Sequence, residues 1–203
     1  KKLLDVACGT GGHLKFLEKK FDCFGMDASN EMLKIARKKL NKSILKKGNM
    51  VDFSINKDFD IILCLFSSIG YAKTYKNLEK AIANFSNHLR KGGIAIIEPW
   101  FTKSTFRAGN PHMSTYDSRD LKIARLNISV VRGNLSVMDM HYLIAEKGVG
   151  VRHFVDRHEL GLFSIKDTLR IMRESGFNPI YLKKGLMKDR GSMFCSINYN
   201  TLV

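Results

Sequence analysis

An apolar run followed at once by closely spaced glycines opens the chain and constrains its fold more than any other segment. Residues 3–7 are typical of a buried parallel strand, and Gly9 and Gly11 allow a tight turn in which the backbone can approach a ligand. One helix and one further strand are expected before Asp27. A carboxylate at the end of a second strand can accept hydrogen bonds from a ribose diol. The segment therefore predicts a nucleotide-containing cofactor at the ends of the first two strands.

The spacing of the glycines distinguishes between nucleotide cofactors. A dinucleotide fingerprint would place a third glycine where this chain has Leu14. Instead, Asp5 is followed by three residues and then by Gly9-Thr10-Gly11. This pattern resembles motif I of the class I S-adenosylmethionine (AdoMet) methyltransferases, which have a Rossmann-like sheet. The resemblance implies that AdoMet is bound by Asp5, Ala7, Gly9, Thr10, Gly11, Asp27 and Ala28.

Strands and helices alternate through the first half of the chain, which is typical of a parallel α/β sheet. After the second strand the pattern predicts a helix over 31–41, capped by Asn30, strands over 43–48 and 60–65, a helix over 75–90 and a strand over 93–98. His88, late in its helix, is expected to be solvated. We expect a single domain over residues 1–203.

The pattern changes after Pro99-Trp100. Residues 120–160 lose helical spacing and indicate antiparallel strands, with Arg132-Gly133-Asn134 as a hairpin turn. The fold class is therefore α/β: a Rossmann-like class I methyltransferase sheet with a small antiparallel β insert, over about 101–163, after the fifth strand. The remaining elements are expected to be a helix over 164–175, capped by Ser164, and strands over 179–182 and 193–199.

The charge balance of the chain is strongly basic. It carries 34 Lys and Arg against 19 Asp and Glu, a net charge of +15. Such a charge fits either a lysine-rich solvated surface or an anionic partner such as a nucleic acid or a phosphorylated small molecule. The basic residues are spread over the whole chain, which favours the first interpretation. No run of about 18 apolar residues is present, so we predict no membrane span.

The four cysteines, Cys8, Cys23, Cys64 and Cys195, form no C-x-x-C pair. Three of them lie in apolar, strand-like runs, which indicates reduced, buried thiols in a cytoplasmic protein rather than zinc ligands. We therefore expect no metal site. The chain begins almost directly on its first strand and without Met, and we expect a further N-terminal segment to precede it.

Segments after the third and fourth strands complete the predicted cofactor site. Asn49 and Met50 follow the third strand, where methyltransferases of this kind hold the adenine. There the amide of Asn49 can meet the exocyclic amine, and Met50 can pack on the ring. Ligands of open α/β sheets bind beyond the carboxyl ends of the strands. This rule predicts that Leu65 and Phe66 line the site near the sulfonium, with Tyr71 close to them.

Several longer sequence segments carry a closer resemblance. They resemble the amino-sugar N-methyltransferases of macrolide biosynthesis, and they are DVACGTGGH, FSSIGYAKT, GGIAIIEPW, KGVGVRHFVDRH and a terminal RGSMF. Those enzymes dimethylate the 3-amino group of a dTDP-linked deoxysugar. The resemblance implies AdoMet as the cofactor, a dTDP- or UDP-amino sugar as the small-molecule substrate, and a homodimer. Asn49 in place of an acid, and RGSMF in place of RGLF, depart from the family pattern.

Five side chains are the candidates for the acceptor side of the site. Tyr71 and His153 are the candidate catalytic residues, since a histidine can accept or relay the proton of an amine. Arg152 and Arg190 lie in segments that resemble the amino-sugar N-methyltransferases. Arginine can bind a diphosphate through two parallel hydrogen bonds. Trp100, just beyond a strand end, is the remaining candidate for substrate binding, and its other interpretation is packing for the insert.

Two other functions remain open from the sequence. In the first, the acceptor is another small amine or an oxygen nucleophile. In the second, prompted by the positive charge, it is a nucleic acid. Methyltransferases of base amines commonly carry an N/D-P-P-Y/F motif after the fourth strand, where this chain has Leu65-Phe66-Ser67-Ser68. We also see no cluster of aromatic side chains among basic ones, so we do not expect a nucleic-acid partner.

Overall fold

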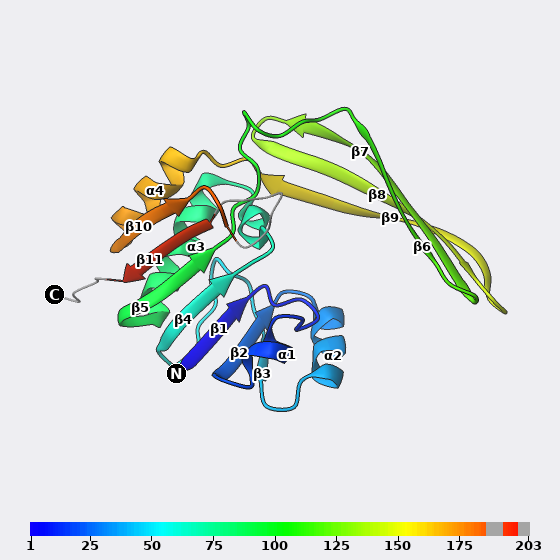
Figure 1. The fold of residues 1–203 in the computed structure, drawn as a ribbon. Coiled ribbons are helices and arrows are strands. Elements are labelled where there is room, and N and C mark those ends of the chain that lie inside the picture. Colours follow the sequence, from blue (N-terminus) through cyan, green and yellow to red (C-terminus); the bar gives the residue numbers. More distant parts are fainter. Residues whose placement is uncertain (186–192, 199–203) are drawn as a thin grey trace.

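The computed structural model describes residues 1–185 and the backbone of residues 193–198. Within these residues the chain forms one mixed seven-stranded sheet and one antiparallel four-stranded sheet (Figure 1). The order across the larger sheet is β10-β11-β5-β4-β1-β2-β3. Its strands are β1 (Lys2–Val6), β2 (Asp22–Asp27), β3 (Ile44–Lys47), β4 (Phe59–Cys64), β5 (Leu89–Ile97), β10 (Phe177–Leu182) and β11 (Met193–Asn198).

The first five strands of the larger sheet are parallel to one another, and β11 is antiparallel between β5 and β10. The predicted Rossmann-like α/β sheet is thus confirmed. Because the chain runs outward from β1 to β3 and then returns to β4 beside β1, the strand order reverses next to β1. Open sheets of this kind bind ligands at such a switch point, beyond the carboxyl ends of the strands.

Helices cover both faces of the larger sheet. Leu3 packs in one core with residues of α1 (Leu14–Leu17) and α2 (Asn30–Lys39). Leu4 packs in a second core with residues of α3 (Tyr75–His88) and α4 (Ile165–Glu174). Neighbouring residues of a strand point to opposite faces, so β1 is buried on both sides, as its apolar run indicates. None of the described helices is long and apolar enough to cross a membrane.

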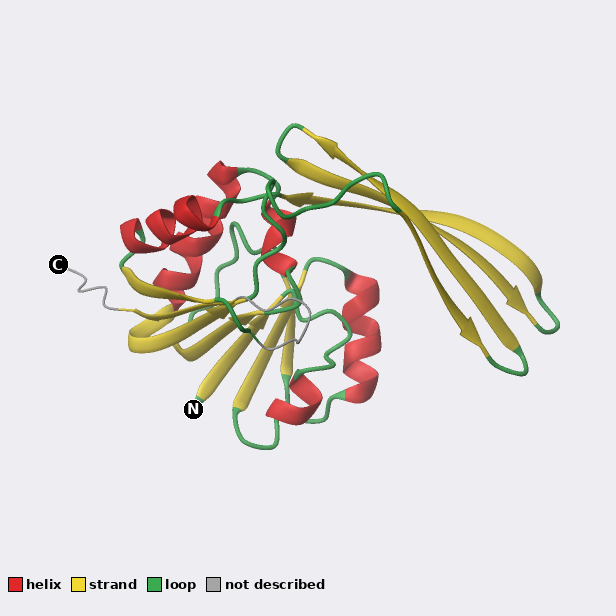
Figure 2. Cartoon of the chain, turned by 45° about the horizontal axis from the view of Figure 1, so that its top comes forward, coloured by secondary structure: helices red, strands yellow, loops and turns green. Residues whose placement is uncertain are grey.

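The smaller sheet projects away from the body as a long curved arm (Figures 1 and 2). Its strands are β6 (Pro111–Asp117), β7 (Leu121–Arg132), β8 (Leu135–Glu146) and β9 (Gly150–Gly161). We call this sheet the arm. The predicted antiparallel insert after the fifth strand is confirmed, including the hairpin turn, in which Gly133 has a φ of +61°. The strands of the arm are longer and more continuous than the interrupted apolar pattern of the sequence indicates.

Three local predictions need correction. The cap of α2 is Ser29, whose Oγ accepts a hydrogen bond from the Met32 N–H at 3.3 Å, so Asn30 is the first helical residue instead. Helix α3 ends at His88 and β5 begins with Leu89, whereas we expected the helix to reach residue 90 and the strand to begin at residue 93. His88 is half-buried rather than solvated.

The ring of His88 joins α3 to a neighbouring loop. Its Nε2 accepts a hydrogen bond from the Ile55 N–H at 3.1 Å, and its Nδ1 lies 2.8 Å from the Asn84 carbonyl oxygen. The ring also packs on Phe53, with 4.4 Å between the ring centroids. A histidine late in a helix therefore has a structural role here, because the loop supplies a backbone N–H that needs an acceptor.

Candidate active site

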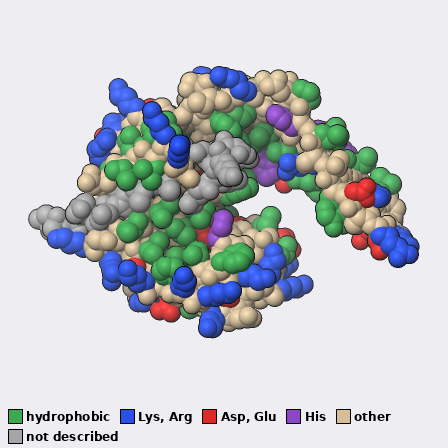
Figure 3. All heavy atoms as spheres, viewed as in Figure 1, with side chains coloured by type: hydrophobic (Ala, Val, Ile, Leu, Met, Phe, Trp, Pro, Cys, Tyr) green, Lys and Arg blue, Asp and Glu red, His purple; other side chains and the backbone are tan. Residues whose placement is uncertain are grey.

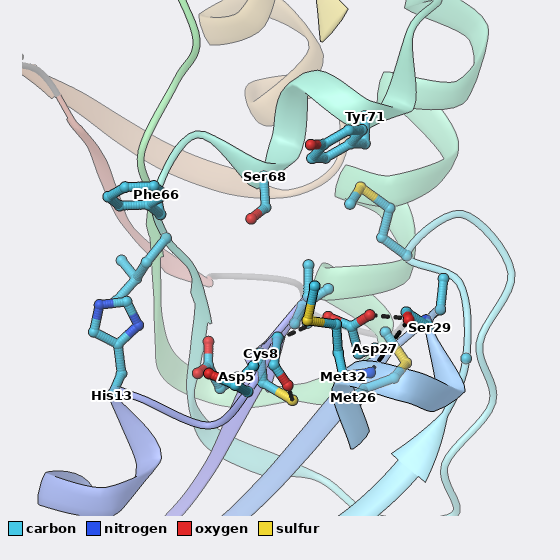
Figure 4. Close-up of a pocket in the computed structure, with 18 of the residues that line it drawn as sticks. Asp5, Cys8, His13, Met26, Asp27, Ser29, Met32, Phe66, Ser68 and Tyr71 are labelled. Carbon is cyan, nitrogen blue, oxygen red and sulfur yellow. Dashed lines mark hydrogen bonds between the residues drawn. The ribbon is translucent and has the colours of Figure 1, made fainter. Parts of the chain in front are cut away.

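A cavity of about 650 Å³ lies at the carboxyl ends of β1, β2 and β4 (Figure 4). This is the place where the strand order reverses. Ten of the residues predicted to bind the cofactor line it: Asp5, Ala7, Gly9, Thr10, Asp27, Ala28, Asn49, Met50, Leu65 and Phe66. Tyr71 lines it as well. The structure thus brings these side chains together, while their part in binding remains a prediction.

The loop after β1 passes repeatedly through the left-handed region of the backbone. Ala7, Gly9 and Gly11 all have positive φ angles, of 59°, 54° and 74°. Gly11 does not line the cavity, although we predicted that it binds the cofactor. A Cβ atom on Gly11 would lie 2.7 Å from Leu40 Cδ1. Glycine suits this position because its φ is positive and because a side chain would displace Leu40 at the end of α2.

The carboxylate of Asp27 holds two segments of the site. Its Oδ2 accepts a hydrogen bond from the Gly9 N–H at 2.7 Å, and its Oδ1 accepts one from the Ser29 N–H at 2.8 Å. Each carboxylate oxygen has a second lone pair, and Asp27 lines the cavity. Asp27 can therefore bind a ribose diol while it holds the glycine loop and the start of α2 in place.

Asp5 is the most unusual group in the site. It is 1% exposed, and its Oδ2 is buried without a hydrogen-bond partner. Burial, with a smaller contribution from the negative charge of Asp27, raises the pKa of this carboxyl to about 7. An orphaned buried carboxyl at a cavity wall fits a cationic group on a ligand, because a cation would supply the missing partner and favour the charged form.

The segment after β3 offers a second polar group. Asn49 Oδ1 accepts a long hydrogen bond from the Val51 N–H at 3.3 Å, which holds the turn. The oxygen keeps a lone pair, and its amide group keeps two donors, for a ligand. Met50 is buried in the main core and also lines the cavity. This pair fits a flat heterocycle with an exocyclic amine, as the sequence predicts.

Glu98, just after β5, does not line the cavity but supports a loop that does. It is buried, and its carboxylate accepts a hydrogen bond from the Phe66 N–H. Phe66 and Ser67 both have positive φ angles, and Ser67 Oγ donates to the Pro99 carbonyl oxygen at 3.0 Å. The end of β5 therefore holds the strained loop after β4.

Tyr71 lies on η1 (Ser68–Ala72), on the far side of the cavity from Asp27 (Figure 4). Its hydroxyl oxygen is 2.6 Å from His158 Nδ1, and His158 Nε2 is 3.1 Å from Asp156 Oδ2. Burial and the nearby charge of Asp156 raise the pKa of the Tyr71 hydroxyl above its usual value, so Tyr71 stays protonated at neutral pH. His158 was not among our candidate residues.

The candidates for the acceptor side are placed apart. His153 and Arg152 lie on β9 in the arm: His153 Nε2 is 3.2 Å from His141 Nδ1, and Arg152 pairs with Glu146 at 2.6 Å. Neither lines the cavity. Trp100 does not line it either, and its Nε1 donates to Ser136 Oγ at 2.8 Å, which fits the packing role. Arg190 lies outside the described residues.

Two further sequence expectations concern cysteines and metals. Cys8, Cys23 and Cys64 are buried free thiols, as the sequence indicates, and the side chain of Cys195 lies outside the described part. Burial raises the pKa of each of the three thiols, so they stay protonated. Within the described residues there is no group of three or more His, Cys, Asp and Glu that could hold a metal ion.

Comparison with known proteins identifies the family. The model of a methyltransferase domain matches residues 3–93. The dTDP-3-amino-3,4,6-trideoxy-alpha-D-glucopyranose N,N-dimethyltransferase of Streptomyces venezuelae is 39% identical over 90% of this chain and 78% of its own length. The dTDP-3-amino-3,6-dideoxy-alpha-D-glucopyranose N,N-dimethyltransferase of Streptomyces fradiae is 32% identical over 90% of this chain and 72% of its own length. The chain is an AdoMet-dependent methyltransferase.

Solved structures of this methyltransferase family extend the similarity to the arm. DesVI from Streptomyces venezuelae superposes with a TM-score of 0.90 at 37% identity, over 98% of this chain and 84% of its own. The sugar N-methyltransferase KedS8 from Streptoalloteichus superposes with a TM-score of 0.91 at 34% identity, over 98% of this chain and 81% of its own. The predicted enzyme class and its resemblance to sugar N-methyltransferases are thus confirmed.

The raised pKa of Asp5 makes stability depend on pH. The folded protein keeps this proton to about pH 7, whereas the ordinary pKa is 3.8. Between these values the unfolded chain binds fewer protons, so stability falls as the pH rises. We expect the ligand-free protein to lose roughly 2–3 kcal/mol more between about pH 5 and pH 8 than Asp5→Asn does, measured by urea unfolding.

Asp22→Asn is the control for this experiment. Asp22 is an exposed carboxyl on the neighbouring strand, at the end remote from the cavity. We expect its pH dependence to match that of the wild-type protein. Parallel stability curves for the wild-type protein and Asp5→Asn would show that Asp5 does not titrate in this range.

Proposed function

We propose that this methyltransferase transfers methyl groups from AdoMet to the amino group of a nucleotide-linked amino sugar. The observation that carries the proposal is the similarity over nearly the whole chain, arm included, to enzymes named for this reaction. A third such relative, from Saccharopolyspora spinosa, is named for dTDP-4-amino-2,3,4,6-tetradeoxy-D-glucose and is 33% identical over 94% of this chain and 76% of its own length. These relatives share the nucleotide and the amine and differ in the sugar.

The cavity fits AdoMet in its charge and polarity. The orphaned carboxyl of Asp5 offers a partner for a cationic group, which AdoMet has in its α-amino group and its sulfonium. Asp27 would bind the ribose diol, and Asn49 and Met50 would bind the adenine. Gly9 and Thr10 would approach the methionine part. When bound there, AdoMet supplies a methyl group that is already activated for transfer to a nucleophile.

The acceptor side of the cavity is mostly apolar, with the hydroxyls of Ser68 and Tyr71 as its polar groups. Leu65, Phe66, Ser68 and Tyr71 form this wall, and Figure 4 shows the Tyr71 hydroxyl beside the open space. An amine attacks through a lone pair, so it must arrive uncharged. The amine of an amino sugar titrates near neutrality, and a desolvated site favours its neutral form. The wall therefore has to orient an amine rather than activate it strongly.

The charge distribution supports a small acceptor over a nucleic acid. Among the described residues that line the cavity there is no Lys or Arg. The many Lys and Arg side chains are spread over the visible surface instead of gathering at one site (Figure 3). A polyanion would need a concentrated basic groove leading to the site of chemistry. The three free, buried thiols are typical of the reducing cytoplasm, where we place the reaction.

The proposed activity is tested by incubating the protein with AdoMet and either dTDP- or UDP-linked 3-amino and 4-amino sugars. We expect a methyl group on the sugar nitrogen of at least one of them, detected by mass spectrometry and fragmentation. The matched acceptor is the same nucleotide sugar with a hydroxyl in place of the amine, and we expect it to stay unmodified. Methylation of the hydroxyl sugar alone, or of none of these acceptors by protein that binds AdoMet, would contradict the proposal.

Asp27 provides a test of the cofactor site. Removing its carboxylate removes a charged acceptor of hydrogen bonds, which contributes about 1.5–3 kcal/mol. We expect Asp27→Ala to weaken AdoMet binding by this amount in calorimetry. Asp22→Ala, at the opposite end of the same strand, is the control and should bind normally. Equal affinity of Asp27→Ala and the wild-type protein would place the ribose elsewhere.

The arm supports a homodimer. Apolar side chains remain exposed along it, among them Met113 at 70% and Val151 at 68%, and an apolar sheet normally packs against a second layer. From residue 111 to 161 the arm has seven Lys and Arg against six Asp and Glu. The arm is thus nearly neutral in a strongly basic chain, so a second copy would meet little repulsion there.

Light scattering after size-exclusion chromatography tests the dimer. We expect the wild-type protein to have the mass of a dimer and Val151→Asp to have the mass of a monomer, because a charge would be buried without a partner. Ile44→Asp, at another exposed apolar position, on β3 away from the arm, is the control and should remain dimeric. A monomeric wild-type protein would contradict the proposed association.

A further inference from the structure

Three side chains from two separate elements form a row of polar contacts that ends at the cavity. Tyr71 is on η1 and lines the cavity, whereas His158 and Asp156 are on β9 at the base of the arm. The Tyr71 hydroxyl oxygen is 2.6 Å from His158 Nδ1, and His158 Nε2 is 3.1 Å from Asp156 Oδ2. Residues two apart on a strand share a face, so β9 presents the histidine and the carboxylate together.

The charge of Asp156 selects the tautomer of a neutral His158 ring, and this tautomer sets the direction of the hydrogen bond to Tyr71. The Asp156 carboxylate lies 3.1 Å from His158 Nε2, and its negative charge favours a proton on that nitrogen. In the neutral ring Nδ1 is then an acceptor. The Tyr71 hydroxyl therefore donates to Nδ1. Its proton points away from the cavity, and the lone pairs of its oxygen remain available as acceptors on the cavity side.

The surrounding contacts hold this geometry. A Cβ atom on Gly70 would lie 2.9 Å from Leu160 Cδ2, so η1 packs directly against β9. Lys73, just after η1, pairs with Glu159 at 2.9 Å. The Leu160 carbonyl oxygen also accepts a hydrogen bond from Ser136 Oγ on β8 at 3.2 Å. These contacts attach η1 to β9 at Gly70 and at Lys73, on either side of Tyr71. They therefore hold Tyr71 beside His158.

We propose that Tyr71 accepts an N–H hydrogen bond from the substrate amine and that His158 and Asp156 are the positioning pair that keeps the Tyr71 oxygen an acceptor. The inference rests on the proposed function. An amine that donates one N–H to Tyr71 has a fixed orientation, and its lone pair points elsewhere in the cavity. Without His158 the hydroxyl can rotate and present its proton, which would compete for that lone pair.

This hydrogen bond also limits the number of methyl groups that are added. A primary amine has two N–H groups, and a monomethylated amine has one. A dimethylated amine has none in its neutral form, so it cannot donate to Tyr71. We therefore expect primary and monomethylated amino sugars to be substrates, and the reaction to stop at the dimethylated amine.

The kinetic test compares variants of Tyr71 and His158. We expect Tyr71→Phe and His158→Leu each to lower kcat about tenfold, the effect of one lost hydrogen bond, with AdoMet affinity unchanged. The double variant should be no slower than Tyr71→Phe, since the two side chains act through one contact. His158→Asn keeps an acceptor near the position of Nδ1 and should recover part of the rate. His141→Leu, a histidine of the arm away from this row, is the control.

A measurement without substrate separates this inference from the proposed function. Nitrogen-15 NMR of the histidine rings should show His158 with its proton on Nε2 and an unprotonated Nδ1. A proton on Nδ1 instead, or wild-type kcat in both Tyr71→Phe and His158→Leu, would overturn the positioning role even if the enzyme methylates amino sugars. If the ring has the expected protonation and no amino sugar is methylated, the proposed function fails instead.

Discussion

The two hydrogen bonds accepted by the Asp27 carboxylate join the parts of the site that come from different strands. One oxygen holds the backbone of Gly9 in the loop after β1, and the other holds Ser29 at the start of α2. The glycine loop has positive φ angles at three positions, a path that needs support from its surroundings. Without this carboxylate, the loop and the helix would lack their shared anchor, and the floor of the cavity would lose its shape.

The opposite wall of the cavity depends on the arm. Trp100 and Ser136 join the end of β5 to β8, and Ser136 in turn donates to Leu160 on β9. Against this framework η1 places Tyr71 at the cavity. The insert after the fifth strand is therefore more than a peripheral addition to a methyltransferase core. Its base supplies groups that contact Tyr71, and its outer part carries the exposed apolar side chains on which the proposed dimer rests.

The sequence predicted the fold and most of the cavity lining because their signals are local. An apolar run with two glycines, a carboxylate at the end of the next strand and alternating periodicities all depend on neighbours in the chain. Gly11 shows a limit of such reasoning, since its conformation was expected but its close approach is to Leu40 and not to the cavity.

Long-range register was beyond the reach of the sequence. The approach of His158 to Tyr71 depends on how β9 lies against η1, and no local pattern encodes this. His153 and Arg152 were chosen because their segment resembles a family motif, but they lie nearer the outer end of the arm, close to the turn between β8 and β9. A shift of a few residues along a strand thus separates a side chain at the site from one remote from it.

A crystal structure with S-adenosylhomocysteine and a dTDP-linked amino sugar is the most direct test of a methyltransferase site that is divided between these two walls. The expected result is an adenosine between Asp27 and Asn49, with the sugar nitrogen within hydrogen-bond distance of the Tyr71 oxygen and facing the sulfur. An adenosine bound elsewhere, or a sugar nitrogen on the far side of the cavity from Tyr71, would contradict it.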